Sequence, residues 1–525
     1  MKEIKELKFE ELTLKQKLGL VHAAAASDGT PKEEIECLRE LIREHAIGAV
    51  WIQWDNGGTD ELLKMVKETA DYPILIVTDA ECGIGKYRIG HHNALGRCAS
   101  EEHAYAFGKA VGVSARKMGY NTICSPVLDI KENGWSRAIG SDKNEIARIA
   151  AAEAKGLKDA GMLTIGKHYP SADDLEDVDT HMIEAQSAQS EEELLDKNLY
   201  PYLYLMNKGL LDGVMPAHHK LFNIDPDYPA SLSKKVLDIL RRQGFDGIMM
   251  TDALCMMGIR AKFGDVESRG LAIAAGNDLP LPYDGRIAFM KESLEKCYND
   301  GIFTDEQLDI AVKRVLNAQH KVMMNSSCKS EISDDEDRLS KAINEDSVCA
   351  LLDEGVNLEI SRDGRHYFAV MIKNQSFNAS KVADVDTFTR EWLYPEMIKE
   401  RILELFPNSE VTFYCEFPYQ CHNYQIINNS LGFDDVIFLT FSECIAYMGA
   451  EHLTRRVVSL INSMQRTGRI STLIHFGNPK VVEELSHIER RIFAPASPLS
   501  TLAAIDVLAG LNSANGVLTY DVNLK

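Results

Sequence analysis

The chain has 525 residues, of which 79 are acidic and 57 basic, and its formal net charge is −22. A chain of this length exceeds the roughly 250–300 residues that one hydrophobic core usually serves, so we expect two large domains. An acidic surface repels phosphate backbones and anionic lipids, which disfavours nucleic acid and membrane partners and favours a small neutral substrate.

The N-terminal segment and the cysteines indicate a location. The first twenty residues are charged throughout and lack the apolar stretch of a signal peptide. No run of about 18 apolar residues appears, so we expect no membrane-spanning helix. The 11 cysteines are scattered without a C-x-x-C pair, which is typical of reduced thiols. We therefore expect a cytoplasmic protein, either a monomer or a homodimer.

Short apolar runs alternate with longer amphipathic stretches from the N-terminus onward. Runs of this length are typical of strands buried on both faces, as in parallel sheets. The clearest helical stretch between them is Asn144–Ala160, and Leu232–Arg242 and Glu267–Ala275 are further candidates. The expected strands are Ile47–Trp54, Pro73–Asp79, Thr122–Ile130, Leu163–Tyr169, Gly213–His218, Gly247–Leu254 and Asn277–Pro282.

This repeated strand-then-helix order predicts a parallel α/β fold, which could be an open sheet or a closed barrel. Polar or ionisable residues at the strand ends favour a TIM-type (β/α)₈ barrel, because the carboxyl ends of barrel strands form one ring where catalytic groups gather. These strand-end residues are Asp79, Asp129, Lys167, His168, His218 and Asp252.

A polar, acidic segment at Asn325–Asp337 marks a change in composition and reads as a linker. We expect the barrel at residues 1–325, a linker at 326–345 and a smaller α/β sandwich domain at 346–525. A helix is expected at about Leu339–Glu354. The elements expected after it are strands at His366–Ile372, Val411–Cys415, Val436–Phe441, Thr472–Phe476 and Arg491–Ala494, and an amphipathic stretch at Leu453–Arg466.

The segment Gly244–Gly258 ends a buried strand with Asp252. A carboxylate held there by a rigid strand can attack or stabilise an oxocarbenium-like centre, as glycoside cleavage requires. The residue could equally cap the helix that follows, since aspartate is favoured at that position. From this segment by itself the two interpretations are about equal.

The segment Lys167–Pro170 is followed by an acidic loop that ends in Asp179–Thr180–His181. An aspartate two residues from a histidine can orient the imidazole and stabilise its cation, which makes a proton donor and acceptor suited to neutral pH. Most such triplets lie in solvated loops without a special role, so the triplet gains weight only from its surroundings.

Several blocks occur together in the order found in glycoside hydrolase family 3, which the chain resembles, and most of all in its bacterial β-N-acetylglucosaminidase branch. They include PILIVTDAE, GYNTICSPVLDI, SRAIGSD, GLKDAGMLTIGKHYP and YPASLSKKVLDILRRQGFDGIMMTDALCM. The resemblance covers roughly residues 10–320 and continues more weakly through HFGNPKVV and GVLTYDV. Many ordered blocks are more specific than any single motif.

The resemblance implies roles for individual residues. Asp252 matches the nucleophile, which forms a covalent glycosyl-enzyme and gives net retention. His181 matches the general acid/base on a mobile loop, and Asp179 matches its orienting partner. The sugar-binding candidates are Asp79, Arg137, Lys167 and His168, with Arg88 and the strand-end His218 as further candidates. No cofactor is expected.

The chain departs from the family pattern in three segments that the resemblance places around the substrate. Ser171–Asp174 replaces the Gly-His-Gly that normally follows Lys-His-Phe-Pro, so the loop should take a different course. The block after Asp79 reads AECGIGKYR, where a sugar-binding arginine is expected. Ala253 replaces a second acid after Asp252, which removes one nearby negative charge. We interpret these changes as a shifted substrate.

The expected function is hydrolysis by an exo-acting β-N-acetylglucosaminidase that removes a terminal GlcNAc-type sugar. A β-glucosidase or a glycoside phosphorylase on the same site is one alternative, and an inactive sugar-binding homologue is another. The adjacent histidines His91–His92 and His218–His219 lack a partner set with ligand spacing, so no metal is expected.

Overall fold

The computed structural model describes residues 4–54, 58–372, 395–442, 444, 446–447 and 449–525. The chain forms two compact units. Unit 1 comprises Met1–Tyr87, Ala104–Ile130 and Lys143–Ser340, and unit 2 comprises Arg88–His103, Lys131–Asp142 and Lys341–Lys525. Two short stretches of the N-terminal half therefore belong to unit 2. The expected domain boundaries 1–325, 326–345 and 346–525 stay a prediction.

Unit 1 is a nearly closed barrel of parallel strands, which confirms the predicted barrel. The strand order is β1-β2-β3-β4-β5-β7-β9-β10, and β10 packs beside β1. Apolar side chains such as Leu75, Ile165 and Met250 fill the centre of the barrel. The strands are β1 (Ala23–Ala25), β2 (Ala49–Trp51), β3 (Leu75–Thr78), β4 (Thr122–Ile123), β5 (Leu163–Tyr169), β7 (Gly213–Pro216), β9 (Ile248–Ala253) and β10 (Leu279–Leu281).

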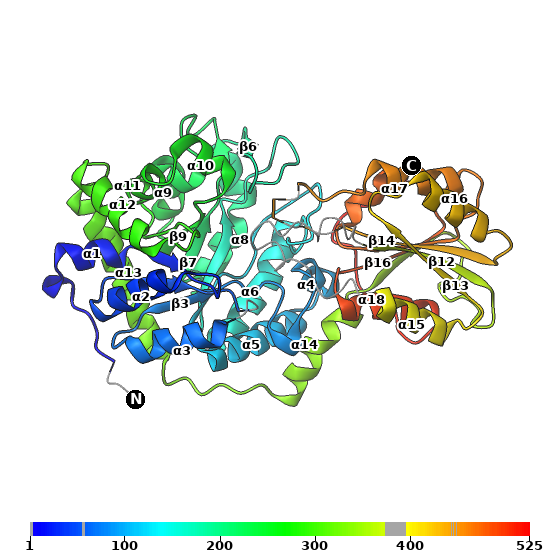
Figure 1. Ribbon diagram of the computed structural model, residues 1–525, viewed down its shortest axis with the longest axis horizontal. Coiled ribbons are helices and arrows are strands. Elements are labelled where there is room, and N and C mark those ends of the chain that lie inside the picture. Colours follow the sequence, from blue (N-terminus) through cyan, green and yellow to red (C-terminus); the bar gives the residue numbers. More distant parts are fainter. Residues whose placement is uncertain (1–3, 55–57, 373–394, 443, 445, 448) are drawn as a thin grey trace. The chain divides into compact units, whose positions relative to one another are not determined.

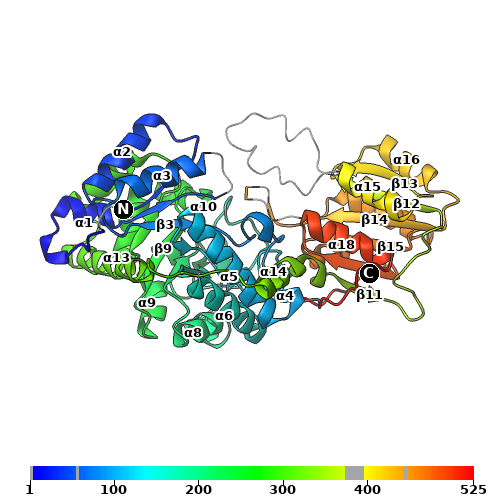
Figure 2. The same ribbon diagram turned by 90° about the horizontal axis from the view of Figure 1, so that it is seen from below.

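Helices surround these strands (Figures 1 and 2). They are amphipathic: α9, for example, buries Val236, Leu237 and Leu240, and the Ser233 side chain caps its first turn, a contact worth about 1 kcal/mol. The helices are α1 (Leu14–Leu20), α2 (Lys32–Arg43), α3 (Thr59–Thr69), α5 (Glu101–Met118), α6 (Lys143–Asp159), α7 (Glu191–Glu193), α8 (Tyr200–Asn207), α9 (Lys234–Arg242), α10 (Met257–Phe263), α11 (Glu267–Ala275), α12 (Ile287–Asn299) and α13 (Asp305–Asn325). Helix α14 (Asp334–Asp346) begins in unit 1 and ends in unit 2.

Shorter elements complete unit 1. Strands β6 (Gln186–Ser187) and β8 (Lys220–Leu221) pair in parallel outside the barrel sheet. Single turns of 3₁₀-helix occur at Phe9–Glu11, Gly85–Tyr87 and Ala230–Leu232, and a π-helix at Leu194–Asn198. In the part of the chain that the structure describes, no helix has the length and apolar character to cross a bilayer.

Unit 2 is an α/β sandwich, as predicted. Its sheet has the order β11-β16-β15-β14-β12-β13, and all neighbouring strands are parallel except β11, which is antiparallel to β16. Figure 1 shows α16 and α17 on one face of the sheet and α15 and α18 on the other. The elements are β11 (Cys349–Leu352), β12 (His366–Ile372), β13 (Glu410–Cys415), β14 (Asp435–Phe441), β15 (Thr472–Phe476), β16 (Arg490–Ala494), α4 (Asn93–Cys98), α15 (Pro395–Leu405), α16 (Gln420–Asn429), α17 (Arg455–Gln465), α18 (Pro498–Leu508) and a 3₁₀-helix at Pro479–Glu484.

Three elements differ from the sequence-based expectation. The strand expected at Thr122–Ile130 is wrong after Ile123, where β4 ends. The helix expected at about Leu339–Glu354 is wrong in its C-terminal part, because α14 ends at Asp346 and Cys349–Leu352 forms β11. The short apolar run Cys349–Leu352 is compatible with either a helix or a strand. It forms a strand because it pairs with β16. The first barrel strand, Ala23–Ala25, escapes prediction because alanine has low strand propensity.

Candidate active site

Asp252 lies at the carboxyl end of β9. The first four residues of β9 are buried and Asp252 is half-buried. The backbone N–H of Ala253 donates to Asp252 Oδ1 at 2.7 Å. Burial by itself raises the pKa of this carboxyl, but the imidazoles of His168, His218 and His181, together with that N–H, lower the pKa to about 2. Asp252 is therefore ionised at neutral pH, as a carboxylate nucleophile must be.

The N-terminal end of β9 is held by the buried carboxylate of Asp278. Asp278 Oδ2 accepts from the Met249 N–H at 2.8 Å and from Arg241 Nη2 at 3.0 Å. Arg314 Nη1 lies 3.4 Å from the other oxygen. Burial raises the pKa of Asp278, against the lowering effect of the two arginines. These contacts hold the strand that carries Asp252.

His218 follows β7 and contacts the backbone next to Asp252. Its Nε2 lies 3.0 Å from the carbonyl oxygen of Ala253, and its Nδ1 lies 2.7 Å from Ser231 Oγ. Because a carbonyl oxygen only accepts, Nε2 carries the proton and Nδ1 accepts from the Ser231 hydroxyl. Burial lowers the pKa of His218, against the raising effect of Asp252. Both ring nitrogens thus have protein partners.

Lys167, near the end of β5, lies between two carboxylates. Its Nζ is 2.7 Å from Asp79 Oδ1 and 3.2 Å from Glu81 Oε2. The Lys167 side chain is 1% exposed, whereas that of Asp79 is 35% exposed. The lysine charge offsets the two acids in a buried setting. Asp79 keeps enough exposure to accept a hydrogen bond from a bound molecule.

His168 is oriented by Asp129, which follows β4. Asp129 Oδ2 accepts from the His168 backbone N–H at 3.0 Å and lies 2.8 Å from His168 Nδ1. The peptide bond between Lys167 and His168 is cis. Because the partner of Nδ1 is a carboxylate, Nδ1 carries a proton and the ring orientation is fixed.

The acidic loop, residues 171–185, carries Asp179 and His181. Asp179 Oδ1 accepts from the His181 N–H at 2.9 Å and lies 2.8 Å from His181 Nδ1. The carbonyl oxygen of His181 accepts at 2.9 Å from the N–H of Met257, the first residue of α10, which follows β9. A Cβ on Gly258 would lie 2.9 Å from the Glu184 nitrogen, so glycine allows this close approach. The loop therefore rests on the segment that follows β9.

The sequence profile of the glycosyl hydrolase family 3 N-terminal domain matches residues 7–318. The chain belongs to glycosyl hydrolase family 3. This match confirms the resemblance predicted from the ordered sequence blocks, and it makes the chain a glycoside hydrolase.

Curated relatives in this family are named beta-hexosaminidase. The protein from Tolumonas auensis is 29% identical over 267 residues, which cover 47% of this chain and 79% of the relative. The protein from Methylococcus capsulatus is 32% identical over 260 residues, which cover 46% of this chain and 77% of the relative. The matched lengths correspond to somewhat less than half of this chain.

Solved family 3 structures share the fold over nearly the whole chain. A β-N-acetylglucosaminidase from Paenibacillus aligns with a TM-score of 0.81 at 23% identity and covers 98% of this chain and 100% of that one. The β-glucoside phosphorylase BglX aligns with a TM-score of 0.79 at 19% identity and covers 98% and 95%. At these identities the likeness shows the fold alone.

The family 3 barrel of this chain brings seven of the nine predicted site residues into one described unit. They are Asp79, Lys167, His168, Asp179, His181, His218 and Asp252. The other two, Arg88 and Arg137, belong to unit 2. Arg137 lies over the Trp135 ring, 4.9 Å from its centroid, and the carbonyl oxygen of Arg88 accepts from Asn344. Their role in sugar binding stays a prediction.

Three further residues lie beside the predicted site residues: Glu81, Asp129 and Asp174. Glu81 is the second acid of the Asp79 block, and Asp129 was expected at a strand end although β4 ends at Ile123, so the sequence held a signal for both. Asp174 lies 2.7 Å from the Nε2 of His219. That contact joins two segments that are far apart in the sequence. The sequence offered only two hints of it: an acid at position 174, where the family pattern has no acid, and the adjacent histidines His218–His219.

Proposed function

We propose that this family 3 enzyme is a retaining, exo-acting β-N-acetylglucosaminidase. The observation that carries the proposal is the Asp252 carboxylate at the carboxyl end of β9, with the His181–Asp179 pair on a loop whose His181 carbonyl oxygen accepts from the Met257 N–H. The beta-hexosaminidase relatives support the same reaction class. A nucleophilic carboxylate beside a separate proton donor is the arrangement that a double displacement needs.

In the first step Asp252 attacks the anomeric carbon while His181 protonates the departing glycosidic oxygen. Asp179 holds Nδ1 of His181, so Nε2 is the atom that exchanges the proton. The product is a glycosyl ester on Asp252 and a free aglycone alcohol. In the second step neutral Nε2 takes a proton from water, the water oxygen attacks the anomeric carbon, the bond from that carbon to the Asp252 oxygen breaks, and the Asp252 carboxylate leaves. Two inversions give net retention.

The proposed substrate is a small neutral glycoside with a terminal GlcNAc-type sugar. Asp79 accepts hydrogen bonds from sugar hydroxyls and Lys167 donates, while His168, whose Nδ1 faces Asp129, contacts the sugar through Nε2. Arg88 and Arg137 are proposed as further donors to the sugar. We propose that the enzyme works as a monomer or homodimer without nucleic acid partners. We also propose a cytoplasmic location, with which the 11 free cysteines of the described structure agree.

Charge favours hydrolysis over phosphorolysis. The acidic loop carries Asp173, Asp174, Glu176, Asp177 and Asp179, and residues 171–180 include no lysine or arginine. Lys197 balances the charge of Asp173, but a phosphate acceptor that approaches along this loop still meets more carboxylates than lysines, whereas water carries no charge. Water is therefore the proposed acceptor.

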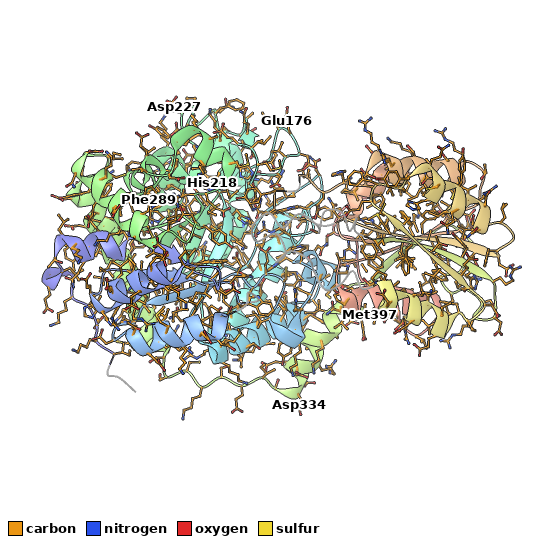
Figure 3. The ribbon with its side chains drawn as sticks, in the orientation of Figure 1. Glu176, His218, Asp227, Phe289, Asp334 and Met397 are labelled. Carbon is orange, nitrogen blue, oxygen red and sulfur yellow. The ribbon has the colours of Figure 1, made fainter. Side chains whose placement is uncertain are left out.

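The test is an assay of purified enzyme on 4-nitrophenyl β-glycosides of GlcNAc, GalNAc, glucose and xylose, with and without phosphate. The proposal expects turnover of the GlcNAc substrate, no glycosyl phosphate and initial release of the β-anomer. Asp252→Ala should abolish turnover, and His181→Ala should reduce it by roughly 10²–10⁴-fold. The matched control is Asp227→Asn, an exposed aspartate on the same unit (Figure 3). Loss of activity in the control, or full activity in Asp252→Ala, contradicts the assignment.

A further inference from the structure

Three consecutive residues after β7 each touch a different part of the site. His218 contacts the backbone that follows Asp252. His219 Nε2 lies 2.7 Å from Asp174 Oδ1 near the start of the acidic loop. The Lys220 N–H donates to the carbonyl oxygen of Ala185, the last residue of that loop, at 2.8 Å. One short segment thus connects the nucleophile strand with both ends of the loop that carries His181.

The two ends of the acidic loop are held in different ways. Beyond Ala185 the chain forms β6, whose residues pair with β8 through backbone contacts. At the start of the loop, the contact with the β7 segment is made by side chains, those of Asp174 and His219. The neighbours of Asp174 have other partners: the Leu175 N–H donates to the Gln186 carbonyl oxygen at 2.9 Å, and Lys197 Nζ donates to Asp173 Oδ2 at 2.9 Å. A substitution at Asp174 or His219 therefore removes the contact with the β7 segment while these contacts and the β6–β8 pairing stay in place.

Burial separates the loop into a base and a tip. The side chains of His219 and Asp174 are 6% and 16% exposed. In contrast, Leu175, Met182 and Ile183 are 57%, 40% and 50% exposed, and Figure 3 shows Glu176 on this outer part. A segment with so few buried apolar side chains has low local stability, so its position depends on its anchors.

We propose that Asp174 and His219 form a positioning pair that holds the acidic loop so that His181 can reach the glycosidic oxygen. The inference rests on the proposed function and adds two residues to it. Asp174 is the last residue of the Ser171–Asp174 stretch that stands where the family pattern has Gly-His-Gly. The side-chain contact replaces the constraint that a tight glycine-containing path provides. Neither residue contacts the reacting atoms in this account, and both act through His181.

A positioning role for a general acid has a kinetic signature. A good leaving group departs without protonation, whereas a poor one needs the acid. Loss of the pair should therefore lower kcat/KM at least ~10-fold for phenyl β-N-acetylglucosaminide and by less than ~2-fold for the 2,4-dinitrophenyl glycoside, because general acid catalysis contributes roughly 10²–10⁴-fold. A purely structural role would reduce both values equally.

The experiment compares Asp174→Asn, His219→Gln and the double variant on these two substrates. The matched control is Glu176→Gln, which removes an exposed carboxylate from the same loop. The expected result is a leaving-group-dependent loss in each single variant, no further loss in the double variant, and wild-type kinetics in the control. Equal losses on both substrates, or additive losses in the double variant, overturn the pairing.

Hydrogen exchange gives a readout that needs no turnover. In Asp174→Asn the amides of residues 172–185 should exchange faster than in wild type, while the barrel strands and the Glu176→Gln control stay unchanged. Unchanged exchange in the loop overturns the positioning pair. A wild-type enzyme that cleaves no β-glycoside overturns the proposed function instead, and the exchange measurement then still decides whether Asp174 and His219 hold the loop.

Discussion

His218 donates its Nε2 proton to the carbonyl oxygen of Ala253 at 3.0 Å. The N–H of the same Ala253 donates to the carboxylate of Asp252. A buried imidazole is thus connected through one residue to the proposed nucleophile. Since Ser231 in turn occupies the other ring nitrogen of His218, the end of β9 is fixed by side chains from outside the strand.

Replacement of His218 tests this support. His218→Ala leaves the Ala253 carbonyl and the Ser231 hydroxyl without their partner, which costs about 2 kcal/mol for buried polar groups. We expect a loss of that size in the free energy of unfolding by urea, and a lower kcat with a smaller change in KM. His320→Ala, at a half-exposed histidine paired with Glu6, should leave kcat unchanged. An unaltered kcat in His218→Ala contradicts the support role.

The depressed pKa of Asp252 predicts acid sensitivity. Its pKa is lowered from 3.8 to about 2 in the folded chain, so the ionised group stabilises the fold above pH 4 and this contribution is lost as the pH falls toward 2. By pH 3 the loss amounts to about 1 kcal/mol. Urea unfolding of wild type and Asp252→Asn at pH 5 and pH 3 measures the difference. A wild-type loss no larger than that of Asp252→Asn would show that the carboxyl is not shifted.

Lys167→Met tests the charge balance around Asp79. It leaves the carboxylates of Asp79 and Glu81 close together without the cation that joins them. Breaking such a pair costs about 3–5 kcal/mol when it is buried; because Asp79 is 35% exposed, we expect the lower end, about 3 kcal/mol. Adding Glu81→Gln should restore part of the stability. If the double variant is as unstable as Lys167→Met, charge repulsion is not the cause.

Replacement of Asp278 should lower the stability of the fold with little effect on the reaction. Asp278→Ala removes the carboxylate that Arg241 and the Met249 N–H share at the base of β9, and we expect a loss of about 3 kcal/mol. Asp246→Ala, whose exposed carboxylate lies 3.4 Å from Arg314, should cost less than about 1 kcal/mol. Below its unfolding temperature, Asp278→Ala should keep kcat within about 3-fold of wild type. A much lower kcat in fully folded protein would assign Asp278 a role in the reaction.

Local sequence patterns predict much of the barrel. Helix α11 is found at the expected residues, Glu267–Ala275, because its helical pattern is unbroken. Asp252 could be placed because a long apolar run ends in an acid. By contrast, Ala23–Ala25 is a strand only because β2 pairs with it, and such pairing is not visible in three alanines.

Which site residues contact one another is harder to predict than which residues lie near the strand ends. Asp129 and His168 are 39 residues apart, and each was visible as a strand-end residue, but nothing in the sequence pairs them. The contact between Asp174 and His219 depends on the path of the acidic loop, which the loss of the family's glycines made unpredictable. Sequence thus indicates which residues reach the strand ends, and three-dimensional packing decides which of them meet.

The central claim is that Asp252 forms the glycosyl-enzyme. The most direct measurement is mass spectrometry of peptides from enzyme incubated with a slow fluorinated β-N-acetylglucosaminide that accumulates the covalent intermediate. If Asp252 is the nucleophile, one added sugar is expected on the peptide that contains Asp252, and no adduct is expected in Asp252→Ala. An adduct on another residue, or an adduct that persists in Asp252→Ala, would contradict it.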